Sequence, residues 1–285
     1  MSKKVIVIGA GPAGITSAIY LHRAGIETLV LHNGIGGLEK ADKIENYYGF
    51  ETAISGQDLF ENGIKQAENI GIKVIKSQVY AIAYNEQFEI TTEDETYKSD
   101  AVIMANGISR NKPAIENLSK YEGAGVSYCA TCDGFFYKDL NVGVLGNSEY
   151  TLHEAQELLP IAKNVTIFTN GKDLEVEDET FTVNNKKIKS LSGKFNLENI
   201  EFEDGEKIDI DGLFIAAGVA SGTDLAKKIG VLTDDKGGVI VDDERKTNVP
   251  GIFAAGDCTR GLLQVSKAVY DGAVAAKSAI AFLRK

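Results

Sequence analysis

A glycine-rich turn between a strand and a helix constrains the fold of this chain more than any other feature. Residues 5–9 form a β-branched run that ends in Gly9-Ala10-Gly11-Pro12-Ala13-Gly14, and a helical pattern of apolar residues follows. In this pattern the first glycine permits a tight turn, the second lets the backbone approach a pyrophosphate, and the third allows close helix–strand packing. A further apolar strand over residues 28–31 completes a βαβ unit. The turn therefore predicts a dinucleotide-binding domain in the first part of the chain.

The second half of the chain repeats this plan. Another strand and glycine turn cover residues 141–146, and the next apolar strand covers residues 164–168. Each half also contains short alternating segments, within residues 88–98 and 181–210, that predict small antiparallel sheets. We therefore predict an α/β protein with two Rossmann-like domains, each built from three ββα layers.

The two domains are predicted to be interleaved. At 285 residues the chain is long for one core, so two domains are the natural expectation. The run Asn111-Lys112-Pro113 marks one crossing, and residues 242–248 mark the return, because the strand that follows resembles the first domain. This division predicts one discontinuous domain over residues 1–110 and 246–285 and a second domain over residues 113–243.

Charge and hydropathy exclude several classes of function. The net charge of -11 argues against nucleic acid as a partner. Charged residues or glycines interrupt every apolar run before it reaches membrane-spanning length, and the first strand leaves no room for a signal peptide. Three cysteines do not make a disulfide scaffold and fit a reducing compartment with one working pair. We therefore expect a cytoplasmic protein with no membrane partner.

Two of the cysteines lie close together in the run Cys129-Ala130-Thr131-Cys132-Asp133. A Cys-x-x-Cys pair can cycle between dithiol and disulfide, because its spacing suits a small ring and lowers the pKa of one thiol. A zinc site would need two further ligands, but the chain offers only Cys258 and three histidines without ligand spacing. The pattern therefore predicts thiol–disulfide chemistry and no metal site, with Cys258 as a small buried core residue.

Six motifs occur in order along the whole chain and identify a family. They are residues 9–14, Gly36-Gly37, Ile44-Glu45-Asn46-Tyr47, Ala105-Asn106-Gly107, residues 129–133 and Ala254-Ala255-Gly256-Asp257. In these motifs the chain resembles the low-molecular-weight thioredoxin reductases. The resemblance implies a glutathione-reductase-like fold, FAD bound by residues 1–110 and 246–285, and a second domain with the redox disulfide. It also implies thioredoxin as the substrate and a homodimer.

The resemblance implies roles for single residues. Asp257 is expected to meet the ribitol of FAD, and Gln264 is expected to lie near the isoalloxazine ring. Cys132 is expected to face the flavin and Cys129 to attack the partner protein. Asp133 resembles the residue that exchanges a proton with the dithiol in this family.

Two residues depart from the family pattern near the implied cofactor. Leu38 stands where glutamine is usual, and Leu263 stands where arginine is usual. Neither departure argues against FAD itself. The implied FAD contacts are Gly9, Gly11, Pro12, Ala13, Gly14, His32, Asn33, Gly36, Gly37, Leu38, Asn46, Val79, Ala105, Gly107, Asp257, Gln264 and Val265.

The second glycine turn departs further from the family pattern. Family members bind NADPH there through Gly-x-Gly-x-x-Ala, but this chain reads Gly146-Asn147-Ser148-Glu149-Tyr150-Thr151. The side chain of Ser148 would stand where backbone meets the pyrophosphate, and Glu149 adds negative charge at the helix start. The 2′-phosphate normally pairs with arginines after the next strand, but residues 173–179 are acidic and no arginine occurs between Arg110 and Arg245. The chain therefore most resembles the ferredoxin-dependent flavin thioredoxin reductases, which lack a nicotinamide site.

Several functions remain open on the sequence. The favoured one is an enzyme that passes electrons from reduced ferredoxin through FAD and the Cys129/Cys132 pair to thioredoxin. The same scaffold could instead use NAD(P)H or a reduced deazaflavin, or could oxidise a small-molecule dithiol with oxygen. A flavin redox sensor without turnover is the non-enzymatic alternative, against which the retained cysteines and Asp133 argue. The lysines Lys186, Lys187 and Lys189 could dock an acidic ferredoxin, but a solvated hairpin face explains them better.

Overall fold

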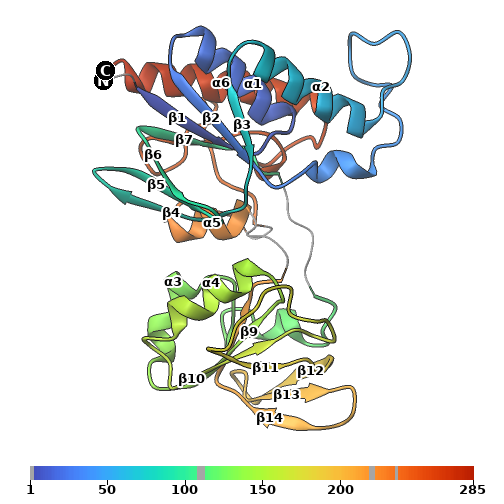
Figure 1. Ribbon diagram of the computed structural model, residues 1–285, viewed down its shortest axis with the longest axis vertical. Coiled ribbons are helices and arrows are strands. Elements are labelled where there is room, and N and C mark those ends of the chain that lie inside the picture. The colour runs from blue at the N-terminus through green and yellow to red at the C-terminus, as the bar shows by residue number, and fades with distance from the viewer. Residues whose placement is uncertain (1–2, 108–112, 218–221, 235–236) are drawn as a thin grey trace. The chain divides into compact units, whose positions relative to one another are not determined.

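The computed structural model describes residues 3–107, 113–217, 222–234 and 237–285, with every side chain in these ranges except those of Lys40 and Cys132. The chain divides into two compact units, residues 1–109 with 221–285 and residues 110–220 (Figure 1). The return to the first unit therefore lies at residue 221 and not at the predicted residues 242–248. The reason is helix α5 (Gly222–Lys228), because Nζ of Lys228 donates to the backbone oxygen of Tyr80 in the first unit at 3.1 Å.

A parallel sheet forms the centre of the first unit. Five of its described strands pair in the order β16-β7-β1-β2-β3, and β4, β5 and β6 form a separate antiparallel sheet. Helices α1, α2 and α6 cover one face of the parallel sheet, and the antiparallel sheet lies on the other side (Figure 1). All of β7 is buried, as expected for a strand that is covered on both faces. The elements of this unit besides α5 are β1 (Lys4–Ile8), α1 (Pro12–Arg23), β2 (Glu27–His32), the 3₁₀ helix η1 (Gly36–Lys40), α2 (Gly56–Asn69), β3 (Lys73–Lys76), β4 (Val79–Asn85), β5 (Gln87–Thr92), β6 (Thr96–Ser99), β7 (Ala101–Met104), β16 (Ile252–Ala254), η4 (Gly256–Cys258) and α6 (Val265–Leu283).

Helices α1 and α6 pack closely because small residues line their contact. Pro12 begins α1, where its fixed φ and missing N–H suit the first helical position. A Cβ on Gly272 of α6 would lie 2.2 Å from the backbone oxygen of Ala13. The hydroxyl of Ser17 lies 3.0 Å from the backbone oxygen of Gly272. This contact holds α6, from the end of the chain, against the first βαβ unit.

The second unit repeats the plan of the first. Its described strands pair in a parallel sheet of order β11-β10-β9-β15-β8, with β12, β13 and β14 in an antiparallel sheet. The duplication predicted from the sequence is therefore present. The elements are η2 (Leu118–Tyr121), β8 (Val126–Ser127), α3 (Ala130–Asp133), η3 (Gly134–Tyr137), β9 (Asn141–Leu145), α4 (Glu149–Leu158), β10 (Asn164–Phe168), β11 (Thr182–Asn184), β12 (Ile188–Ser192), β13 (Asn199–Phe202), β14 (Lys207–Asp209) and β15 (Gly212–Ile215).

Among the residues that the structure describes, no helix is both long and apolar enough to cross a membrane. Within the same ranges, histidine, cysteine and acidic side chains do not gather in any group of three or more that could hold a metal ion.

Candidate functional site

The first glycine turn has the conformation that its sequence predicts. Gly9 has a φ of +112°, and a Cβ there would lie 2.3 Å from the backbone oxygen of Ala105. A Cβ on Gly14 would lie 1.8 Å from the backbone oxygen of Gly9, so Gly14 packs beneath the turn. At Gly11, by contrast, a Cβ would meet no atom within 4 Å. The turn therefore leaves the backbone of Gly11 open at the start of α1.

A cavity of about 320 Å³ opens beside this turn, where β1, β7 and β16 end. Asn46 and Gln264 meet at its wall, and Nδ2 of Asn46 donates to Oε1 of Gln264 at 2.8 Å. The start of α1 has no side-chain cap and no acidic residue in its first turn, which suits a pyrophosphate. The open backbone of Gly11 and the uncapped start of α1 thus suit the pyrophosphate of FAD. The predicted contacts that line the cavity are Gly9, Gly11, Pro12, Ala13, Gly36, Gly37, Leu38, Asn46, Ala105, Gly107, Asp257, Gln264 and Val265.

Some lining residues were missing from the predicted contacts. Lys43, Asn106 and Gly256 also line the cavity. Asn106 and Gly256 belong to the motifs that identify the family, and Lys43 directly precedes another, so proximity to a motif was the available signal.

Replacing Gly11 with Ala is expected to weaken FAD binding at least about tenfold, or 1.4 kcal/mol, without disturbing the fold. The added methyl group would enter the cavity and not the protein interior. The measurement is the dissociation constant of FAD from the reconstituted apoprotein. Gly63→Ala in helix α2 is the matched control, because its Cβ would make only an ordinary 3.6 Å contact with Ile15 of α1. Equal FAD affinity in the two variants would remove the turn from the pyrophosphate site.

Four predicted contacts do not line this cavity: Gly14 packs beneath the turn, and His32, Asn33 and Val79 lie near the end of β2 and the start of β4. His32 is buried, its Nδ1 accepts a hydrogen bond from the N–H of Gly34 at 3.1 Å, and burial lowers its pKa. The side chain of Asn33 donates to Oε1 of Gln78, whose Nε2 donates to the backbone oxygen of Val79 at 2.9 Å. Hydrogen bonds thus link Asn33 to Gln78 and Gln78 to the backbone of Val79, while His32 bonds separately to Gly34. The contacts of His32, Asn33 and Val79 with FAD stay predictions.

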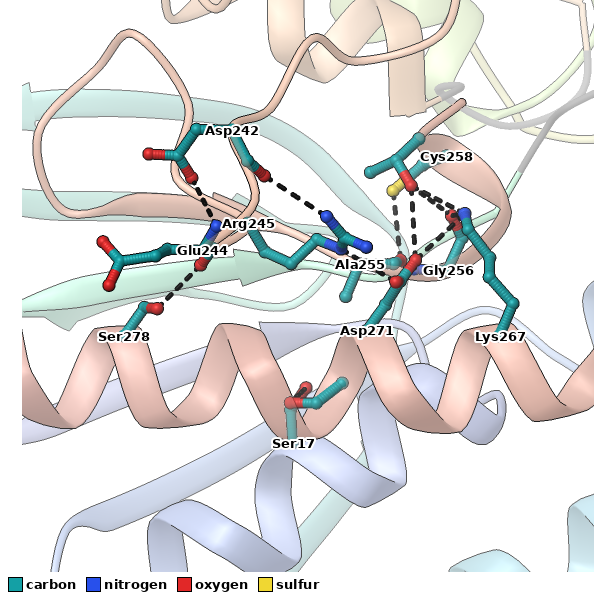
Figure 2. Close-up of polar contacts among 12 residues, drawn as sticks. Ser17, Asp242, Glu244, Arg245, Ala255, Gly256, Cys258, Lys267, Asp271 and Ser278 are labelled. Atoms are coloured by element: carbon teal, nitrogen blue, oxygen red, sulfur yellow. Dashed lines mark hydrogen bonds and ion pairs between the residues drawn. The ribbon is translucent and has the colours of Figure 1, made fainter. Parts of the chain in front are cut away.

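A buried ionic cluster holds the turn that contains Asp257 (Figure 2). Asp271 of α6 is fully buried, and its carboxylate lies 2.8 Å from Nε of Arg245 and 2.9 Å from Nζ of Lys267. The same carboxylate accepts the N–H of Gly256 at 3.1 Å, and Nζ of Lys267 donates to the backbone oxygen of Gly256 at 2.9 Å. The cluster therefore fixes the backbone of the turn from which Asp257 lines the cavity.

Cys258 lies in the same turn and has no redox partner there. It is a free, buried thiol that donates to the backbone oxygen of Ala255 at 3.2 Å. Burial raises its pKa to about 12, so the thiol stays protonated at neutral pH. The prediction of a buried core residue is confirmed.

Replacing Asp271 with Asn is expected to lower the free energy of unfolding by about 3–5 kcal/mol, because Arg245 and Lys267 would keep their charges without the carboxylate. FAD affinity should fall with it, since the turn around Gly256 would loosen. Denaturant unfolding and FAD binding of the holoenzyme measure the two effects. The control is Glu244→Gln, which breaks an exposed pair with Lys246 and should cost less than about 1 kcal/mol. A stability loss in Asp271→Asn no larger than in this control would contradict the role of the cluster.

The Cys-x-x-Cys segment forms the short helix α3 after strand β8. Cys129 is disulfide-bonded and 2% exposed, while the side chain of Cys132 lies outside the described part of the chain. The hydroxyl of Ser127 accepts the N–H of Cys129 at 3.1 Å and donates to Oδ2 of Asp133 at 2.6 Å. Burial, together with the charge of Asp133, raises the pKa of Tyr137. Ser127 thus ties Asp133 to the backbone of the redox segment.

The second glycine turn is closed by the acidic segment that follows β10. Nδ2 of Asn147 donates to Oε1 of Glu175 at 2.9 Å and lies 3.2 Å from the backbone oxygen of Asp173. The N–H of Glu175 donates back to the backbone oxygen of Asn147 at 2.8 Å. Oγ1 of Thr151 accepts the N–H of Ser148 at 3.2 Å, so this donor at the start of α4 already has a partner. A carboxylate therefore lies directly at the turn.

The lysines of the β12–β14 sheet pair with acidic neighbours. Lys186 lies 2.7 Å from Asp204, Lys187 lies 2.7 Å from Glu203, and Lys189 lies 2.6 Å from Glu201. This pairing agrees with a solvated hairpin face.

Comparison with known proteins agrees with this arrangement. A family model described as pyridine nucleotide-disulphide oxidoreductase matches residues 3–272. A thioredoxin reductase from Listeria monocytogenes is 32% identical, over 96% of this chain and 92% of that protein. Among solved structures, the atypical thioredoxin reductase TRi from Desulfovibrio vulgaris Hildenborough is 40% identical, with a TM-score of 0.93 over 99% of this chain and 98% of that chain. A ferredoxin-flavin thioredoxin reductase from Clostridium acetobutylicum is 30% identical, with a TM-score of 0.74 over 100% of this chain and 99% of that chain.

These matches confirm the fold, the family resemblance and FAD as the cofactor. The chain belongs to the pyridine nucleotide-disulphide oxidoreductase family, within which it is a thioredoxin reductase, an FAD-dependent disulfide oxidoreductase.

Proposed function

We propose that this thioredoxin reductase takes its electrons from a reduced ferredoxin and not from NADPH. The observation that supports this donor is the closed second glycine turn, where Oε1 of Glu175 lies 2.9 Å from Nδ2 of Asn147. A pyrophosphate at this turn would have to displace a carboxylate that is already hydrogen-bonded there. Like charges at this distance repel, so the turn disfavours any dinucleotide.

The surroundings of the turn add to this effect. Glu149 lies in the first turn of α4, where the helix dipole would otherwise favour an anion. The chain also offers no arginine between Arg110 and Arg245 for the bidentate pairing that a 2′-phosphate prefers. A ferredoxin needs neither feature, because it delivers electrons without a nucleotide. Similarity to a protein described as a ferredoxin-flavin thioredoxin reductase supports the same donor.

Cys129 and Cys132 are proposed to reduce thioredoxin by disulfide exchange. The thiolate of Cys129 attacks one sulfur of the thioredoxin disulfide, which breaks that bond and forms a mixed disulfide. The thiolate of Cys132 then attacks Cys129, which restores the internal disulfide and releases thioredoxin as a dithiol. Asp133, held by the hydroxyl of Ser127 at 2.6 Å, is proposed to move the protons.

The residues around the first glycine turn are proposed to hold FAD. The backbone of Gly11 and the start of α1 would meet the pyrophosphate, and Asp257 the ribitol. When bound, FAD supplies the exchange between single electrons from the donor and the electron pair that a disulfide requires. On the family resemblance, we also propose a cytoplasmic homodimer.

Anaerobic titration of the purified flavoprotein tests the donor. Reduced ferredoxin, NADPH, NADH and a reduced deazaflavin are added separately, and the loss of flavin absorbance is followed. We expect stoichiometric bleaching by ferredoxin and none by micromolar NADPH or NADH. Bleaching by either nucleotide at micromolar concentration, with ferredoxin inert, would overturn the proposal, and bleaching by the deazaflavin alone would assign the donor to that cofactor.

A further inference from the structure

A buried carboxylate contacts the backbone of the redox segment from behind. Glu154 lies in α4 and is 1% exposed. Its Oε2 accepts the N–H of Ala130 at 2.9 Å, and its Oε1 lies 3.7 Å from Nδ1 of His153. Ala130 directly follows Cys129 and begins α3. The carboxylate of Glu154 is therefore one hydrogen bond away from the Cys-x-x-Cys backbone.

Close packing keeps this contact in place. A Cβ on Gly134, directly after α3, would lie 3.0 Å from Cδ2 of Leu158 in α4. Leu158 is itself fully buried, so the redox segment rests on a filled core.

Glu154 of α4 differs from Asp133, the carboxylate that belongs to the redox segment itself. Asp133 is partly exposed and hydrogen-bonded to Ser127, so it can exchange protons with solvent. Glu154 is sealed from solvent, where an ionised carboxylate interacts more strongly with nearby charges than it would in water. Burying such a group is costly, and its hydrogen bond to Ala130 offsets part of that cost. The disulfide-bonded form of Cys129 carries no charge, whereas a thiolate formed on reduction does.

We propose that Glu154 is a positioning residue that sets the redox equilibrium of the Cys129/Cys132 couple. The inference rests on the proposed redox role of this pair. Reduction breaks one S–S bond and consumes two electrons and two protons, or fewer protons when a thiolate forms. In its ionised form Glu154 disfavours that thiolate, so the carboxylate favours the disulfide and makes the reduced pair a stronger reductant for thioredoxin.

The test compares Glu154→Gln with Glu157→Gln, an exposed residue of the same helix. Gln keeps an oxygen that can accept the N–H of Ala130 but has no charge. Each holoenzyme is equilibrated anaerobically in glutathione buffers of graded potential, and the thiols of Cys129 and Cys132 are counted after alkylation. We expect Glu154→Gln to shift the equilibrium about tenfold toward the dithiol, or about 30 mV, and Glu157→Gln to match the wild type.

A second variant separates charge from hydrogen bonding. Glu154→Met has a similar volume and removes both, and it serves as well if the Gln variant does not fold. Equal shifts in the Gln and Met variants support the proposal. An unchanged equilibrium in Glu154→Gln, or a shift in the Met variant alone, would overturn it. Neither result bears on the electron donor. A wild-type protein in which no disulfide titrates would instead contradict the proposed redox role of Cys129 and Cys132.

Discussion

Replacing Cys129 or Cys132 with Ser is expected to abolish thioredoxin reduction, because a single thiol cannot regenerate the internal disulfide after exchange. Reduction of the flavin by its donor should persist in both variants, since it does not need the thiols. The measurement is anaerobic turnover with thioredoxin beside a separate flavin-bleaching assay. Cys258→Ala is the control and should keep wild-type turnover, because this thiol is buried and free. Wild-type turnover in both Ser variants would remove the pair from the mechanism.

The two Ser variants should also differ from each other. With Cys132 replaced, the mixed disulfide between Cys129 and thioredoxin has no resolving thiol and should accumulate. Non-reducing electrophoresis and mass spectrometry detect this species directly. Accumulation with Cys129→Ser alone would reverse the assigned order of attack.

NADPH is expected to bind the oxidised holoenzyme about 10²–10⁴ times more weakly than it binds a nicotinamide-dependent reductase, a loss on the order of 3–5 kcal/mol. The missing arginine fork and the carboxylate of Glu175 at the second glycine turn are the two causes. A dissociation constant of about 1 μM would become about 0.1–10 mM. Isothermal titration calorimetry measures this constant, with a nicotinamide-dependent thioredoxin reductase as the positive control. A micromolar dissociation constant would mean that the acidic segment opens at little cost.

The sequence predicts the regular part of this fold well. Strand β10 has the predicted bounds, Asn164–Phe168, because a short apolar run between polar residues reads clearly as a strand. The point at which the chain returns to the first unit is predicted less well. Helix α5 packs with the first unit through the Lys228–Tyr80 contact, and nothing in the sequence of that helix specifies which sheet it joins.

The sequence likewise predicts only part of the candidate site. Glycine spacing predicts the turn at Gly9 and Gly11, because the required backbone conformations are local. The contact of Glu175 with Asn147 joins segments 28 residues apart, and the contact of Glu154 with Ala130 joins segments 24 residues apart. The first of these contacts supports the proposed loss of the nicotinamide site, and the sequence alone did not reveal it. Buried carboxylates such as Glu154 and Asp271 have no sequence signature, because an acidic residue in a helix is usually exposed.

Anaerobic turnover with thioredoxin, measured separately with reduced ferredoxin, NADPH and NADH, distinguishes the proposed donor from the nucleotides. We expect rapid, thioredoxin-dependent turnover with ferredoxin and no turnover above background with either nucleotide at micromolar concentration. Rapid turnover with NADPH or NADH and none with ferredoxin would contradict the proposal.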